Sequence, residues 1–256
     1  MILFVFEGDR ECPIFESIQK LFFPKEIDPF VCIYKSNIYS LYSKIKEYDA
    51  FGTNEVDTVS IINEILLEKG DHTLEDITPS SVSEIYLFFD YDFHHNRGAL
   101  EENNLHLKEM LELFNEETES GKLYINYPMV ESLRYTKELP DNNYHDYTIM
   151  REQCKRFKNL ANQFSYYPSF DHLLVSNNKN ISEEKRKRQI EQIKSNWLHL
   201  IDMNVRKANL ICNDIADYPH AKSDIAQCSL FDAQLRKYVE TDVSIHAPTW
   251  GVTQGF

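Results

Sequence analysis

Carboxylates follow two apolar segments of this chain. The segment ILFVF (2–6) runs directly into Glu7, and the segment IYLFF (85–89) runs into Asp90 and Asp92. Glu11 comes four residues after Glu7. Several carboxylates that converge in space repel one another unless a cation lies between them. Such a cluster is typical of a site for Mg²⁺, which prefers oxygen ligands and completes its shell with water and substrate phosphate.

Short strands must position these side chains. From apolar, aromatic and β-branched runs we predict strands at about 2–6, 29–34, 85–90 and 122–126. Helical patterns lie between these runs, which predicts an α/β fold with a parallel sheet flanked by crossover helices. Because parallel strands direct their carboxyl ends to one edge, where ligands bind, we expect the four carboxylates to meet there.

Helices are expected throughout the rest of the chain. In the first half we predict them from Pro13 to about Phe22, over 36–48, over 57–70 with a stop at Gly70, and over 100–117. After Pro140 the pattern changes to helices at 146–164, 182–201, 203–217 and 223–239. These patterns predict two domains, an α/β domain at 1–140 and an all-helical extension at 141–256 packed on it.

Composition restricts the class of protein. The five cysteines show neither a Cys-x-x-Cys pair nor a zinc-binding spacing, which indicates a reduced, cytoplasmic protein. The N-terminal apolar run is too short for a signal peptide, and no apolar run approaches the roughly 20 residues that span a bilayer. The formal charge of −14 repels nucleic acid at long range unless metal ions, a basic face or a partner offsets it.

The order of these motifs resembles the Toprim domain, which topoisomerases, primases and nucleases of the overcoming-lysogenization-defect (OLD) class share. The likeness lies in a strand followed by Glu7-Gly8 and a later strand ending in Asp90-x-Asp92. The stretch LYINYPMVESLRY (123–135) also resembles the strand-Asn-x-Pro-x-x-Glu segment of small Toprim proteins from anti-phage defence loci. Together these motifs cover residues 1–136, and the helical half matches no motif of the family.

The resemblance implies a metal-dependent nuclease that hydrolyses phosphodiester bonds in DNA or RNA, including transfer RNA. Two Mg²⁺ or Mn²⁺ ions would be bound by five carboxylates: Glu7, Glu11, Asp90, Asp92 and Glu131. It also implies that the chain is the toxic effector of a PARIS-like two-component defence system, held inactive by an ATPase of the ABC type. A homodimer that forms a joint substrate groove is a further expectation by analogy.

Basic residues are candidates for contacts with substrate. Lys137 follows the last motif and would stabilise charge that develops on the scissile phosphate, so we predict a catalytic role for it. Four consecutive basic residues form a patch that would contact nucleic-acid phosphates: Lys185, Arg186, Lys187 and Arg188. A solvated helix face is the ordinary alternative for such a run.

Other interpretations of the carboxylates remain open. An acid at a strand end is commonly a helix cap or a solvated loop residue, and Glu131 near a helix start would favour the helix dipole without any metal. A sugar-nucleotide transferase also uses a metal-binding Asp-x-Asp, but it leaves Glu7 unexplained. A haloacid-dehalogenase phosphatase requires Thr or Val where this chain has His94. The non-enzymatic alternative is a regulatory or scaffold subunit with a Toprim fold that binds an ATPase partner.

Overall fold

The computed structural model describes residues 1–22, 29–49, 57–91, 100–126, 129–149, 151–167, 172–211 and 245–246. The chain divides into two units, Met1–Cys12 with Ile27–Ile125, and Pro13–Glu26 with Asn126–Phe256. These ranges differ from the expected 1–140 and 141–256. The reason is that Val130 and Leu133, like Ile14 and Leu21, have their side chains in the core of the second unit.

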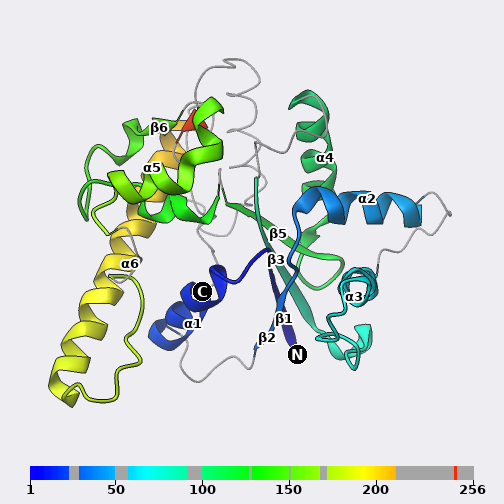
Figure 1. The fold of residues 1–256 in the computed structure, drawn as a ribbon, viewed down its shortest axis with the longest axis horizontal. Coiled ribbons are helices and arrows are strands. Elements are labelled where there is room, and N and C mark those ends of the chain that lie inside the picture. Colours follow the sequence, from blue (N-terminus) through cyan, green and yellow to red (C-terminus); the bar gives the residue numbers. More distant parts are fainter. Residues whose placement is uncertain are drawn as a thin grey trace. The chain divides into compact units, whose positions relative to one another are not determined.

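A five-stranded sheet in the order β2-β1-β3-β5-β4 forms the centre of the first unit (Figure 1). Its strands are β1 (Ile2–Phe6), β2 (Pro29–Ile33), β3 (Glu84–Asp90), β4 (Asn115–Glu116) and β5 (Gly121–Asn126). Strand β1 pairs in parallel with both β2 and β3, and β4 pairs antiparallel to β5. The predicted α/β class and the four predicted strands are therefore confirmed.

Three α-helices accompany this sheet: α2 (Ile38–Asp49), α3 (Thr58–Glu68) and α4 (Leu100–Leu113), with a 3-10 turn η1 at Pro79–Ser81. The ends of α3 follow from its sequence. Asp57 accepts a hydrogen bond from the Ser60 N–H at 3.1 Å, and Gly70, with φ of +73°, ends the segment in a left-handed conformation. Helix α4 stops before the predicted residue 117, because the next residues pair with β5 as strand β4.

In its described residues, the second unit contains helices and two very short strands. Its elements are α1 (Glu11–Phe22, which begins in the first unit), η2 (Val130–Arg134), η3 (Tyr144–Asp146), β6 (Thr148–Ile149), η4 (Arg151–Arg156), α5 (Phe157–Phe164), α6 (Glu183–Ile211) and β7 (Ile245–His246). The prediction of an all-helical extension is wrong here, since β6 pairs antiparallel with β7. The predicted helix at 146–164 is confirmed only over Phe157–Phe164, because the β-branched pair Thr148–Ile149 is extended and Arg151–Arg156 forms a 3-10 helix.

Helix α6 joins two predicted helices into one. It continues through Asp202, the residue that separates the predicted helices at 182–201 and 203–217. The predicted helix at 223–239 lies outside the described residues. Helix α1 begins close to Pro13, as predicted.

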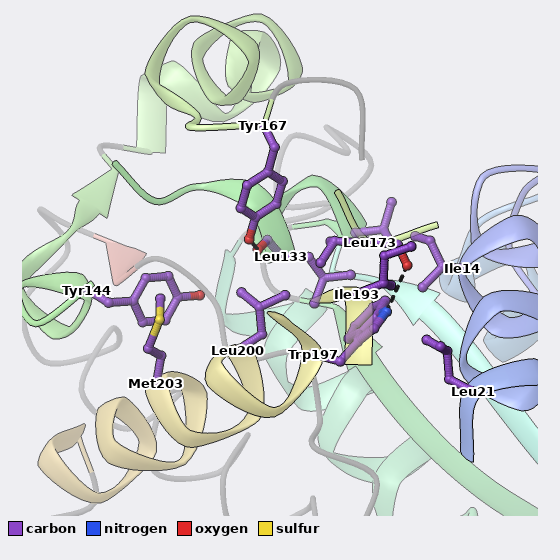
Figure 2. Close-up of a cluster of buried hydrophobic side chains, with 11 residues drawn as sticks. Ile14, Leu21, Leu133, Tyr144, Tyr167, Leu173, Ile193, Trp197, Leu200 and Met203 are labelled. Carbon is purple, nitrogen blue, oxygen red and sulfur yellow. Dashed lines mark hydrogen bonds between the residues drawn. The ribbon is translucent and has the colours of Figure 1, made fainter. Parts of the chain in front are cut away.

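An apolar cluster holds the second unit together (Figure 2). Trp197 of α6 lies in this cluster and donates a hydrogen bond from Nε1 to the Leu173 carbonyl at 2.9 Å. Ser17 of α1 is buried beside the same segment, where its hydroxyl donates to Leu173 O at 3.0 Å and accepts from the Val175 N–H at 2.9 Å. Segments distant in the sequence therefore meet through buried hydrogen bonds as well as apolar packing.

Among the described residues, no helix has the length and apolar character that crossing a membrane requires.

The packing of β5 against β3 can be tested by a substitution at Gly121. Its φ is +113°, and a β-carbon on it would lie 3.1 Å from Cβ and Cγ2 of Ile85. We expect Gly121→Ala to lower the free energy of unfolding by about 2–4 kcal/mol, through backbone strain and overpacking. The matched control is Gly70→Ala, where φ is +73° with open space around the new methyl group, so that only about 1 kcal/mol of left-handed strain is expected. Urea unfolding measures both variants, and equal losses would contradict the proposed clash.

Candidate active site

Register between β1 and β3 brings the first carboxylates together. Phe6 lies opposite Phe88, and the Glu7 N–H continues the ladder with a 3.0 Å bond to the Phe88 carbonyl. Aromatic contacts across the pair hold this register, with ring centroids 5.1 Å apart for Phe4 and Tyr86 and 5.2 Å apart for Phe6 and Phe88. Glu7 and Asp90 are consequently neighbours at the carboxyl ends of adjacent strands.

The strand order makes this edge a favourable place for a ligand. From β1 the chain leads to β2 on one side, whereas from β3 it leads towards β5 on the other. The order therefore reverses between β1 and β3. In open parallel sheets, such a topological switch point opens a crevice outside the strand ends, and ligands bind there.

A direct hydrogen bond joins the two predicted residues. The Glu7 side chain accepts from the Asp90 backbone N–H through Oε2, at 2.8 Å. This bond fixes the Glu7 carboxylate beside Asp90. Both residues are half-buried.

Glu11 is the third carboxylate of this region. It is the first residue of α1, where a negative charge favours the helix dipole, and it is only 4% exposed. Its Oε2 lies 3.7 Å from where a β-carbon on Gly8 would be. The Glu11 side chain thus folds back over the turn that follows Glu7, and the absence of a side chain on Gly8 leaves space beside the carboxylate.

Asp92, the fourth predicted ligand, lies outside the described residues, as do His94 and His95. Within the described ranges, no three Asp, Glu, His or Cys side chains form a group that could hold a metal ion. The donors that the structure does bring to this edge are all carboxylates, and this hard-oxygen chemistry suits Mg²⁺ or Mn²⁺.

Glu131 and Lys137 belong to the second unit. Glu131 lies in η2, not in an α-helix, and its side chain is 3% exposed with the Lys158 ammonium 3.5 Å from Oε1. Lys137 is exposed, and its Nζ lies over the rings of Tyr147 and Phe164, at 5.5 and 5.2 Å from their centroids. The roles predicted for Glu131 and Lys137 stay predictions.

The basic run lies in the first turns of α6. Three of its four side chains are exposed, and Arg186 is half-buried. Arg188 pairs with Glu184 at 2.6 Å, and Arg186 donates to the Asn178 carbonyl at 2.7 Å. The exposed positions of Lys185 and Lys187 are compatible with phosphate contacts and equally with an ordinary solvated face.

Two residues that follow β2 were not among the sequence candidates. Tyr34 is fully buried, and in the described part of the chain its hydroxyl has no hydrogen-bond partner. Burial raises the pKa of Tyr34, and the negative charges of Glu7 and Glu68 add to the effect. Lys35 has a left-handed backbone, with φ of +56°, and its N–H donates to the Glu7 carbonyl at 3.0 Å. Neither a strand pattern nor a motif indicates such a turn.

No family model, curated protein or solved structure matches the chain.

Metal binding can be tested without measuring activity. Added Mn²⁺ at millimolar concentration should raise the melting temperature relative to EDTA, because an ion bound only by the folded state adds about 2.7 kcal/mol at a hundredfold excess over Kd. Glu7→Gln retains an oxygen that can accept the Asp90 N–H but loses the charge, so the metal-induced shift should largely disappear. An exposed acid of the same turn provides the control, Asp9→Asn. Equal shifts in all three proteins would contradict the assignment of Glu7.

The turn beside Glu7 should show a pH dependence. Lys35 Nζ lies 2.8 Å from Asp71 Oδ2, and this bond, together with those from Thr73, lowers the pKa of Asp71 and raises that of Lys35. Stabilisation by Asp71 is thus complete above its unfolded pKa of about 4 and is lost as pH falls towards the folded value. Stabilisation by Lys35 is present below about pH 10 and is lost as pH rises through its raised pKa.

We expect Asp71→Asn to melt at a lower temperature than the native chain from pH 5 to 9, roughly the window between those two limits. The gap should narrow progressively below about pH 4. Lys35→Met should lower the melting temperature at neutral pH by about the same amount as Asp71→Asn. If the difference in melting temperature between Asp71→Asn and the native chain stayed constant down to acid pH, the ion pair between Lys35 and Asp71 would be excluded as its cause.

Proposed function

We propose that this chain is a metal-dependent endonuclease of the Toprim type, which hydrolyses phosphodiester bonds in DNA or RNA. One observation carries the proposal. The Glu7 carboxylate lies against the Asp90 N–H, where the strand order of a largely parallel sheet reverses. This supports the spatial convergence of two motifs that the sequence separates by more than 80 residues.

The residues present fit a divalent cation by their chemistry. We assign Glu7, Glu11, Asp90 and Asp92 as ligands of Mg²⁺ or Mn²⁺, with Glu131 as an additional ligand. Two such ions, when bound, would supply an activated water and electrostatic stabilisation of the leaving oxygen.

The residues of the chain would hold the carboxylates in place and supply positive charge to the substrate phosphates. A backbone N–H orients Glu7, and burial against the Gly8 turn restricts Glu11, so neither carboxylate needs to reorganise when a substrate phosphate arrives. Lys137 would stabilise negative charge on the scissile phosphate. The patch at Lys185–Arg188 would contact phosphates elsewhere on the nucleic acid and offset the overall charge of −14.

The biological setting follows from the resemblance alone. We propose that the nuclease is the toxic effector of an anti-phage defence system in the cytoplasm, controlled by an ABC-type ATPase, with transfer RNA as one substrate class. Two copies of the chain would form the substrate groove. In the scaffold alternative, the carboxylates would have no catalytic effect, and this difference can be measured.

Cleavage of supercoiled plasmid and of total RNA tests the proposal. We expect cleavage with Mg²⁺ or Mn²⁺ and none with EDTA. Glu7→Gln and Asp90→Asn should each reduce the rate by at least about a hundredfold, because each removes a charge that holds the cation. The exposed acid Asp9 again gives the control, and Asp9→Asn should cleave at the native rate. Native-rate cleavage by Glu7→Gln would refute the assignment of Glu7 to the site, whereas a native chain inactive on both substrates with both metals would favour the scaffold alternative.

A further inference from the structure

A polar cleft of about 680 Å³ lies in the first unit, among α2, α3 and α4. Figure 1 shows α2 between the other two helices. The cleft has the size of a small-ligand site, which is typically 300–1,000 Å³. Its lining includes six polar or aromatic side chains: Ser36, Ser40, Tyr42, Lys44, Lys69 and His106.

One end of the cleft lies at the same strand edge as Glu7 and Asp90. Ser36 follows the turn in which the Lys35 N–H bonds to the Glu7 carbonyl at 3.0 Å. Tyr39, which also lines the cleft, donates its hydroxyl to the carbonyl of Tyr91, the residue after Asp90, at 3.2 Å. A polymer held at the carboxylates therefore has the cleft beside it.

The two lysines in the cleft are bound differently. Lys44 lies near three glutamates, at 2.6 Å from Glu64, 3.0 Å from Glu68 and 3.6 Å from Glu47, and these neutralise its charge. Lys69 instead donates to two carbonyls, Tyr34 O at 3.1 Å and Lys35 O at 3.3 Å.

Among the described residues Lys69 forms no ion pair, although its Nζ lies 4.8 Å from the centroid of the Tyr34 ring and the charge of Glu68 acts on it. An ammonium group has three N–H donors, and these two carbonyls use two of them. The third donor suits a phosphate oxygen. Ser36 and Ser40 also line the cleft, where the Ser36 hydroxyl donates to Ser40 Oγ at 3.0 Å and the Ser40 hydroxyl donates to Asn37 Oδ1 at 3.2 Å.

The other end of the cleft contains two rings. The Lys46 Nζ lies over the Tyr42 ring at 5.4 Å from its centroid, so His106 supplies the stacking surface. His106 of α4 stacks on Tyr42 of α2, with centroids 4.0 Å apart and an angle of 21° between the rings. The Tyr42 hydroxyl donates to Glu109 at 2.6 Å, which fixes the ring. Glu102 and Asn103 also line this end and supply hydrogen-bonding groups. Aromatic or imidazole faces with polar neighbours are the usual means of binding an unstacked nucleobase.

We propose that this cleft binds one nucleotide of the substrate, next to the bond that is cleaved, with its phosphate at Lys69 and its base towards Tyr42 and His106. The assignment of that nucleotide to a substrate rests on the proposed nuclease function. The binding of a nucleotide in the cleft is independent of that function.

The test is the binding of adenosine 5′-monophosphate, adenosine and inorganic phosphate to the full chain in EDTA, followed by calorimetry or NMR. We expect the monophosphate to bind more tightly than either part. Lys69→Gln should weaken its binding by about tenfold or more, the loss expected for one charged hydrogen bond. Lys69→Arg should restore most of the affinity, which would show that charge and not local folding is measured.

Two further variants locate the base. His106→Ala should weaken adenosine and the monophosphate by the same factor, because it removes a stacking surface but no phosphate contact. Lys108→Gln, at an exposed lysine of α4 outside the cleft lining, is the control and should bind normally.

Failure to bind the monophosphate at millimolar concentration would overturn the proposal. So would affinity that is unchanged in both Lys69→Gln and His106→Ala, or inorganic phosphate binding as tightly as the nucleotide. Glu7→Gln separates this proposal from the nuclease function, since it should lose cleavage and retain nucleotide binding in EDTA.

Discussion

The parallel pairing of β1 with β3 is the constraint on which the candidate site depends. The two strands contact each other through stacked aromatic rings, and their register sets Glu7 level with the end of β3. Side chains alternate between the two faces of a sheet, so a slip of one residue would turn Asp90 to the opposite face. The same slip would remove its N–H from the reach of Glu7. Packing in the sheet interior thus determines the electrostatics at its edge.

Much of the first unit could be predicted from the sequence because its signals are local. Residues 3–6 are apolar and fully buried, as expected for a strand covered on both faces. Asp57 and Gly70 mark the ends of one helix by capping and by a left-handed residue. To predict that Glu7 and Asp90 are close, only one further rule was needed, that the carboxyl ends of parallel strands lie at the same edge of a sheet. The hydrogen bond between them could not be predicted, because it depends on the turn after each strand.

The second unit was predicted less well, because long-range contacts determine its structure. The Ser17 hydroxyl bonds to a segment more than 150 residues away, and Tyr144 donates to Asn204 of α6 at 3.2 Å. Such contacts stabilise 3-10 turns and extended pairs in a region that has helical periodicity. Glu131 illustrates the same point. Its segment predicts the start of an α-helix, whereas the residue lies in a 3-10 turn and its side chain is buried with Lys158 close by.

Backbone groups orient charges on both sides of the turn at Tyr34 and Lys35. On one side, the Lys35 N–H bonds to the carbonyl of Glu7, whose carboxylate accepts a further backbone N–H. On the other side, the carbonyls of Tyr34 and Lys35 hold the Lys69 ammonium. Backbone dipoles orient a charged group without an opposite full charge. Lys44 differs, because the carboxylates of Glu64 and Glu68 neutralise the charge of its ammonium group. Oriented charges of opposite sign thus lie on either side of one short turn, although the whole chain is strongly acidic.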